Sequence, residues 1–157
     1  MVDIVLADDH EVVRRGLRSL LEAESDFRVV GEVDNGLEVL SLVEKLHPDI
    51  LVLDLMMPGI NGLEVIRLIN QKQIEIGIVI LTMHNGLAYV SESLRCGAKA
   101  YVLKESPYEE LLQAIREVLA GHYFISPLLS ADWSNENAPE ERSRLHIPPH
   151  KGFSSSS

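Results

Sequence analysis

The sequence predicts a doubly wound α/β domain, in which helices cover both faces of a parallel sheet. Three observations lead to this fold class. Five short apolar segments have the length and composition of buried strands, and five segments with helical spacing alternate with them. Polar residues stand where four of the five apolar segments end.

The predicted strands are apolar runs of four to seven residues, and several of them are rich in valine and isoleucine, as buried strands are. In chain order they cover residues 2–7, 27–33, 49–53, 77–81 and 100–103. The third strand after Asp49 and the whole of the fourth strand are apolar, which is typical of strands buried on both faces of a sheet.

The predicted helices carry apolar residues three or four positions apart, so that each presents one apolar face. They cover residues 10–24, 36–47, 62–70, 87–95 and 106–121, and the fourth has the fewest large apolar residues. His47-Pro48 ends the second helix, because the residue before a proline is disfavoured in helical conformation. Ser106 is expected to cap the last helix, with Pro107 at its first position and Gly121 at its end.

The composition is that of one globular domain followed by a different kind of segment. We expect a domain over residues 1–124 and a linker or disordered tail over residues 125–157, which has two consecutive prolines and four terminal serines. The four terminal serines are as consistent with residues appended to the natural sequence as with native ones, so we assign no function to the tail.

The charge and hydropathy exclude several classes of protein. The net charge of −10 argues against direct nucleic-acid binding by this chain, since phosphate neutralisation needs a basic face. No apolar run approaches the roughly 20 residues that cross a bilayer. The sequence begins without a secretory signal, so a cytoplasmic location is expected, and the single cysteine, Cys96, excludes an internal disulfide.

The polar residues at the strand ends are the main functional signal. They are Asp8, Asp9, Asp54, Thr82 and Lys104. The carboxyl ends of parallel strands share one edge of a sheet, so we expect these side chains to meet in one crevice. Crowded carboxylates favour a cation between them, and Mg²⁺ prefers oxygen ligands. A lysine and a threonine hydroxyl suit the oxygens of a phosphoryl group.

Each of these residues also has an ordinary structural interpretation. Asp8 or Asp9 would suit the N-terminus of the first helix, and Thr82 would suit the N-terminus of the fourth. Asp54 would suit the turn before Pro58, and Lys104 would suit an exposed position. Their coincidence at successive strand ends favours the shared site.

The same residues resemble those of receiver domains of bacterial two-component response regulators. The resemblance covers residues 2 to about 123 and includes Met57-Pro58 and Gly62 after Asp54. The segments Leu6–His10, Leu81–His84 and Tyr101–Lys104 are similar to those of the LuxR-type (NarL/FixJ) subfamily. The resemblance implies a flavodoxin-like receiver fold with five helices and a five-stranded parallel sheet in the order 2-1-3-4-5. One departure is Glu105, which stands where many receivers have a proline in a cis bond.

The resemblance also implies the roles of the site residues. Asp54 would accept a phosphoryl group from a sensor histidine kinase. Mg²⁺ would be held by Asp9, Asp54 and the main-chain oxygen of Met56, with Asp8 acting through water. Lys104 and Thr82 would contact phosphoryl oxygens. Tyr101, on what is expected to be an edge strand, would switch a surface by turning inward, although simple packing is the alternative.

The output of such a domain lies elsewhere. In the resembled subfamily a helix-turn-helix domain follows, so transcription regulation and DNA contact would depend on a domain absent from these 157 residues. A homodimer on phosphorylation is one candidate assembly, and the oligomeric state stays open. Two other functions compete. They are an aspartyl-phosphate phosphatase or phosphotransferase, and an interaction module that does not depend on phosphorylation. The first usually needs a second acid two residues after the nucleophile, where this chain has Met56.

Overall fold

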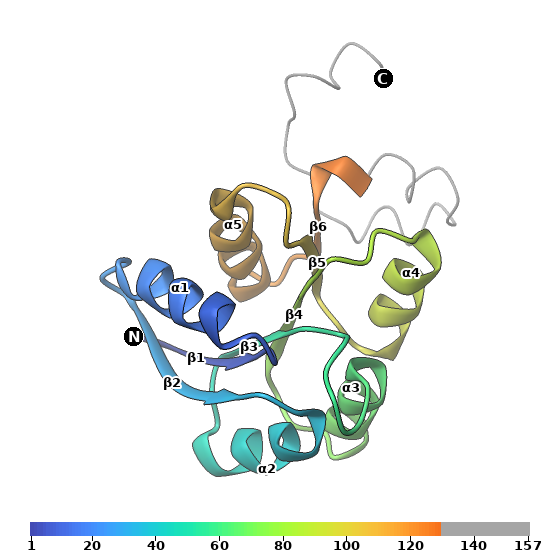
Figure 1. The fold of residues 1–157 in the computed structure, drawn as a ribbon. Coiled ribbons are helices and arrows are strands. Elements are labelled where there is room, and N and C mark those ends of the chain that lie inside the picture. The colour runs from blue at the N-terminus through green and yellow to red at the C-terminus, as the bar shows by residue number, and fades with distance from the viewer. Residues whose placement is uncertain (130–157) are drawn as a thin grey trace.

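The computed structural model describes residues 1–129, which form a six-stranded sheet with five helices around it (Figure 1). The strands are β1 (Val2–Ala7), β2 (Phe27–Val33), β3 (Ile50–Leu53), β4 (Gly77–Thr82), β5 (Ala100–Leu103) and β6 (Phe124–Ile125). Of the linker or tail predicted over residues 125–157, residues 125–129 are described and residues 130–157 lie outside the described residues.

All neighbouring strands are parallel, and their order is β2-β1-β3-β4-β5-β6. The order 2-1-3-4-5 implied by the resemblance is therefore confirmed. The sixth strand was not predicted, because a strand of two residues has no periodicity to detect. Tyr101 consequently lies on an inner strand, and the expectation that β5 forms the edge of the sheet is wrong.

The helices form two layers, one on each face of the sheet (Figure 1). The first layer contains α1 (Glu11–Glu22) and α5 (Tyr108–Leu119). The second contains α2 (Gly36–Leu46), α3 (Gly62–Gln71) and α4 (Leu87–Cys96). Each layer buries its apolar face against the sheet and so forms one of two separate cores.

The strands serve both cores at once, because their side chains alternate between the faces. In β3, Ile50 and Val52 pack with α1 and α5, and Leu51 and Leu53 pack with the other three helices. All four residues of this strand are buried. A continuous apolar run in the sequence thus becomes the centre of the domain, with Asp54 at its end.

The loop after β3 approaches α3 very closely at Gly62. A Cβ atom on Gly62 would lie 2.7 Å from the Cα of Leu55, and the Gly62 N–H donates to the Leu55 carbonyl at 3.0 Å. Asn61 caps α3, because its side-chain oxygen accepts a hydrogen bond from the Glu64 N–H at 3.1 Å. These contacts fix the loop that begins at Asp54.

The start of the last helix differs from the prediction. The N-terminal cap position of α5 is Pro107, and no side chain caps the helix. The hydroxyl of Ser106, the predicted cap, instead lies 3.5 Å from the Ser126 hydroxyl. Among the described residues every peptide bond is trans, including that between Lys104 and Glu105. Within the same residues, no helix combines the length and the apolar character needed to span a membrane.

Candidate functional site

The strand ends bring the predicted residues to one edge of the sheet. The backbone pairing continues past the strands: the Asp8 N–H donates to the Val33 carbonyl at 3.1 Å, and the Asp54 N–H donates to the Ala7 carbonyl at 2.9 Å. On the other side of β3, the Lys104 N–H donates to the Thr82 carbonyl at 2.8 Å. The main chain therefore sets the positions from which these side chains project.

Lys104 links the carboxylates of two different strands. Its Nζ lies 2.6 Å from Asp8 Oδ2 and 2.9 Å from Asp54 Oδ2, and both acids are almost fully buried. Burial by itself lowers the pKa of Lys104, but the hydrogen bonds to Asp8 and Asp54 outweigh it and the pKa is raised. The ammonium therefore stays charged at neutral pH and offsets the repulsion between the two acids.

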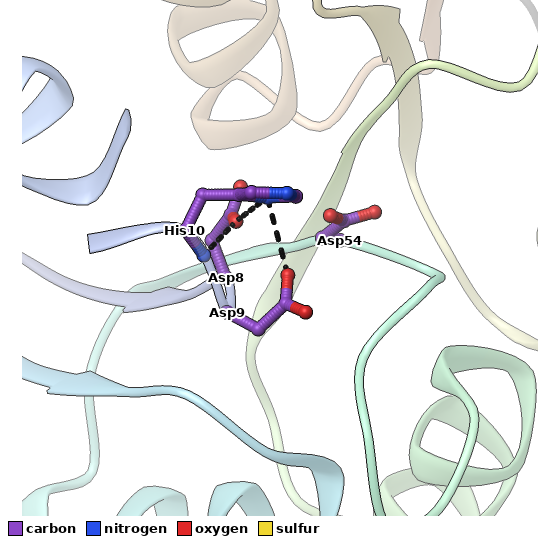
Figure 2. A group of neighbouring side chains, drawn as sticks. All are labelled: Asp8, Asp9, His10 and Asp54. Atoms are coloured by element: carbon purple, nitrogen blue, oxygen red, sulfur yellow. Dashed lines mark hydrogen bonds and ion pairs between the residues drawn. The ribbon is translucent and has the colours of Figure 1, made fainter. Parts of the chain in front are cut away.

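Four potential metal ligands gather beside this ion pair (Figure 2). Ligand atoms of Asp8, Asp9, His10 and Asp54 all lie within 4.8 Å of one another. The Nδ1 atom of His10 lies 3.1 Å from Asp8 Oδ1 and 3.2 Å from Asp9 Oδ1, and the His10 N–H donates to Asp8 Oδ1 at 2.9 Å. The acids come from β1 and β3, and Asp9 is exposed at the mouth of the site.

The donor set fits a hard divalent cation. Three carboxylates supply oxygen atoms, which Mg²⁺ prefers as ligands. Asp9 is exposed to solvent, so the water ligands that Mg²⁺ retains can reach the site there. Asp54 Oδ1 also accepts a hydrogen bond from the Met56 N–H at 3.1 Å, which orients the carboxylate. The side chain of Met56 projects outward, and the residue is about half exposed (51%).

Thr82 and Tyr101 both form hydrogen bonds to the main chain of a third residue, His84. The His84 N–H donates to Thr82 Oγ1 at 3.4 Å, and the Tyr101 hydroxyl donates to the His84 carbonyl at 2.8 Å. Both Thr82 and Tyr101 are fully buried. Burial raises the pKa of Tyr101, and the nearby Tyr89 and Asp54 add to that rise. His84 therefore contacts both side chains, Thr82 through its N–H and Tyr101 through its carbonyl.

The comparison with known proteins decides the family. Residues 4–116 match the family of response regulator receiver domains. The chain is a receiver domain. It belongs to a two-component response regulator of the LuxR type, since its solved relatives include members of that family.

Relatives of this receiver share both its sequence and its fold. The nitrate/nitrite response regulator protein NarL of Escherichia coli strain K12 is 37% identical over 150 residues, which are 93% of this chain and 69% of NarL. A two-component response regulator of the LuxR family from Aurantimonas sp. SI85-9A1 has a TM-score of 0.82 at 38% identity, covering 91% of this chain and 99% of that one.

A third relative is the isolated receiver domain of RcsB from Salmonella enterica serovar Typhimurium, solved with the phosphomimetic BeF₃⁻. It has a TM-score of 0.77 at 30% identity, covering 83% of this chain and 96% of that one. The chain spans 53% to 69% of the length of the first curated relatives that it matches.

The ordinary interpretations of Asp8, Asp9, Thr82 and Lys104 fail in the receiver, whereas Asp54 does make a local turn contact, since its Oδ1 accepts the Met56 N–H. The N-cap of α1 is His10, without a side-chain hydrogen bond to the helix, and the N-cap of α4 is Gly86. Asp8, Asp9 and Thr82 are therefore not the caps of these helices. Lys104 is largely buried in an ion pair rather than exposed.

Sequence reasoning missed two residues near the site. His10 follows the acid pair directly, and its proximity to Asp9 could have been noted. Arg14 lies one helical turn further along α1, and its Nη1 donates to the main-chain carbonyl of Asp8 at 2.5 Å. No pattern in a single sequence predicts a contact between an arginine and a particular carbonyl.

Proposed function

We propose that this receiver takes a phosphoryl group from a sensor histidine kinase onto Asp54, with Mg²⁺ bound beside it. One observation carries the proposal: the Asp54 carboxylate, buried and oriented, lies against the Lys104 ammonium and within a cluster of acids. The oriented carboxylate supports its role as a nucleophile, and the lysine supports stabilisation of charge on the phosphoryl oxygens.

In the proposed transfer, an Asp54 oxygen attacks the phosphorus of a phosphohistidine on the kinase. An O–P bond forms while the P–N bond breaks, and the kinase imidazole departs with the electron pair of that bond and is protonated. Lys104 shifts from the Asp8–Asp54 pair to a phosphoryl oxygen, and Thr82 donates its hydroxyl to another. The Met56 N–H donates to the other Asp54 oxygen and so favours this orientation of the carboxylate during the transfer.

The proposed Mg²⁺ ligands are Asp9, Asp54 and the main-chain oxygen of Met56, with Asp8 acting through water. The ion would neutralise charge that develops on the phosphoryl oxygens. Asp8 has a second role in this scheme, since its ion pair with Lys104 holds the ammonium beside Asp54 before the phosphoryl group arrives.

The proposed output begins at Thr82. When its hydroxyl turns to the phosphoryl group, it releases the His84 N–H, and the loop that also carries the hydrogen bond from Tyr101 is free to rearrange. Tyr101 is already buried, so the proposed switch does not turn it inward from the surface. The proposed switch instead changes its hydrogen bond to His84 and its packing contacts. The surface formed by α4, β5 and α5 would change with it.

The role of the whole protein extends this proposal beyond the receiver. Relatives are named as transcriptional or nitrate/nitrite regulators, so we propose a transcriptional output through a DNA-binding domain distinct from this receiver. A cytoplasmic location and a homodimer on phosphorylation belong to the same proposal. A phosphatase or phosphotransferase is less well supported, because Met56 occupies the position of its second acid.

The test is phosphorylation by acetyl phosphate with Mg²⁺, followed by intact-mass measurement. We expect a mass increase of one phosphoryl group in the wild type and none in Asp54→Asn. Asp34→Asn is the matched control, since Asp34 is an exposed aspartate after β2, at the same edge of the sheet, and should leave phosphorylation unchanged. Phosphorylation of the Asp54 variant, or none in the wild type, would refute the proposal. Continuous release of phosphate in excess over protein would favour the phosphatase.

A further inference from the structure

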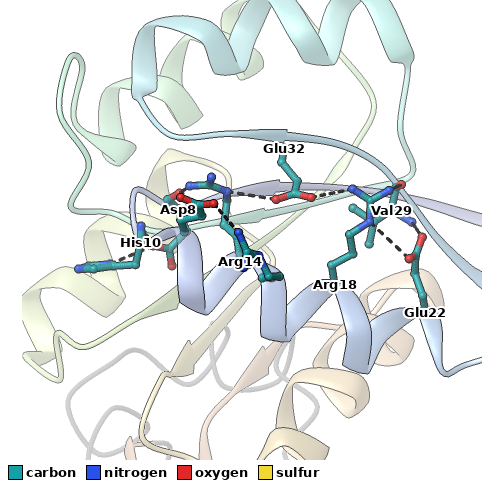
Figure 3. Close-up of polar contacts among 9 residues, drawn as sticks. Asp8, His10, Arg14, Arg18, Glu22, Val29 and Glu32 are labelled. Atoms are coloured by element: carbon teal, nitrogen blue, oxygen red, sulfur yellow. Dashed lines mark hydrogen bonds and ion pairs between the residues drawn. The ribbon is translucent and has the colours of Figure 1, made fainter.

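Arg14 of α1 contacts the main chain of Asp8, the first residue of the acid pair Asp8-Asp9 (Figure 3). Its Nη1 donates to the main-chain carbonyl of Asp8 at 2.5 Å, and its Nε donates to Glu32 Oε1 at 3.1 Å. The side chain is largely buried, with an exposed fraction of 15%. Arg14 thus connects the end of β1 to β2 without touching any carboxylate of the site.

The carbonyl that Arg14 binds belongs to the peptide joining Asp8 to Asp9. On the other side of Asp8, its N–H donates to the Val33 carbonyl at 3.1 Å. The main chain at the acid pair is therefore held from both sides. Any rotation of the Asp8–Asp9 peptide would displace both carboxylates, which lie on its two flanks. The contact with Arg14 opposes such a rotation.

Glu32 anchors the arginine. Glu32 lies on β2 and pairs with Leu6 of β1, which precedes Asp8 by two residues. Its second carboxylate oxygen accepts a hydrogen bond from Arg18 Nη1 at 2.7 Å. Partial burial raises the pKa of Glu32, but the hydrogen bonds from Arg18 and Arg14 outweigh it and the pKa is lowered. The glutamate is therefore ionised at neutral pH and holds the planar Arg14 guanidinium in one orientation.

We infer that Arg14 is a positioning residue for the metal site: it fixes the Asp8–Asp9 peptide and thereby the placement of both carboxylates toward a divalent cation. The inference rests on the proposed function, because it assumes that the acids bind Mg²⁺. It adds a residue on α1 and its partner on β2 to the machinery of the site, neither of which contacts the ion or the phosphoryl group.

Arg18 provides a matched control on the same helix. It also joins Glu32 to a main-chain carbonyl, that of Val29, through Nη1 and Nη2 at 2.7 and 3.4 Å. The two arginines therefore make the same kind of bridge to the same glutamate. They differ in the carbonyl that each holds, since only that of Asp8 belongs to the site (Figure 3).

The experiment compares Arg14→Lys with Arg18→Lys in the full chain. Lysine retains the positive charge, so a change in Mg²⁺ affinity cannot arise from altered long-range electrostatics. Its single ammonium lacks the planar fork that serves two acceptors with separate nitrogens. Mg²⁺ binding to the unphosphorylated chain is measured by titration calorimetry with MgCl₂ alone, and thermal unfolding is measured without Mg²⁺.

We expect Arg14→Lys to weaken Mg²⁺ binding by about tenfold, the lower end of the effect of removing residues that support metal ligands. Arg18→Lys should change the affinity less than about twofold, because the Val29 carbonyl that Arg18 binds lies away from the site. This difference in affinity is expected even where the two variants lose similar thermal stability. Equal Mg²⁺ affinities in the two variants would overturn the inference.

A second pair of variants covers the case in which Arg14→Lys does not fold. Glu32→Gln removes the charge that anchors Arg14, while Glu22→Gln removes a partner of Arg18 and of the Val29 N–H only. Glu32→Gln should bind Mg²⁺ more weakly than Glu22→Gln, and equal binding would overturn the inference. A wild-type chain that binds no Mg²⁺ would overturn the metal site and this role together, whereas normal wild-type binding with an unaffected Arg14→Lys overturns only this role.

Discussion

Lys104 shows how one side chain can serve two states of the same site. An ammonium is a compact charge on a flexible stem, so it can hold Asp8 and Asp54 together and still turn to a new partner. A guanidinium would be committed to a fixed pair of acceptors. The sequence predicted that Lys104 reaches the site, because it directly follows a strand. Its contact with Asp8 was not predicted, since it depends on side-chain conformations at the ends of two separate strands.

Tyr101 gives a prediction at the same scale. Its raised pKa means that the folded chain keeps the phenol protonated at a pH where the unfolded chain, with a tyrosine pKa of about 10, loses the proton. The stability contributed by Tyr101 is therefore complete below about pH 10 and is lost as the pH rises further. Tyr101→Phe should remove this decline, and it should cost about 1 kcal/mol at neutral pH because the hydrogen bond to His84 is lost.

Urea unfolding between neutral and strongly alkaline pH measures this difference, and ultraviolet absorbance follows tyrosine ionisation in the folded chain. We expect Tyr101 to be the last tyrosine to ionise, so the variant should lack the final step. If the wild type and the variant lose stability in parallel above pH 10, burial does not control the ionisation of Tyr101.

At the scale of elements, the apolar strands were predictable because they face a core on both sides and contain few polar residues. Helix boundaries were accurate where a local signal exists, as at Asn35, whose side chain caps α2, and at His47-Pro48. The start of α5 was misplaced because the Ser106 hydroxyl faces Ser126, which is distant in sequence. Long-range contacts of this kind override local preferences.

The loop that carries Asp54 gives a prediction for two glycines in helices. Gly62→Ala would place a Cβ 2.7 Å from the Leu55 Cα, so the backbone of the loop has to shift. We expect a loss of about 1–3 kcal/mol in the free energy of unfolding, together with weaker phosphorylation. Gly16→Ala is the control, because nothing lies within 4 Å of its Cβ position in the middle of α1.

Alanine is the better helix former at Gly16, so this control should gain about 0.5–1 kcal/mol. Urea unfolding of both variants, with phosphorylation by acetyl phosphate measured alongside, decides the outcome. A Gly62→Ala chain as stable as the wild type would mean that the loop accommodates a methyl group without strain.

At the scale of the whole molecule, the predicted domain ends at residue 124, but buried contacts continue beyond it. Ile125 is fully buried against the helix layer of α2, α3 and α4, and Leu129 is nearly so. Ser126 accepts a hydrogen bond from the Leu103 N–H at 3.1 Å and donates to Glu110 at 2.9 Å. A two-residue strand and one serine carry too little pattern for these contacts to be predicted from sequence.

These contacts predict where the folded unit ends. A chain of residues 1–129 retains these contacts and is the reference for urea unfolding. A chain of residues 1–124 should be less stable by roughly 2–4 kcal/mol, since burial of an isoleucine contributes about 1.5–3 kcal/mol and the Leu103 N–H loses its partner. Equal midpoints for the two shortened chains would place the boundary at residue 124.

The direction of β6 has a consequence for whatever follows the receiver. Because β6 runs parallel to β5, it leads the chain toward the rim that carries Lys104: Ile125 lies opposite Tyr101, and the Ser126 hydroxyl accepts from the Leu103 N–H. An antiparallel strand would have carried the chain to the opposite rim, a full strand length away from the phosphoryl pocket. The chain instead reaches Ser126 beside Leu103, the residue before the lysine. A small displacement of β5 would directly move the attachment point of a unit that followed there, and no conformational change through the core would be needed.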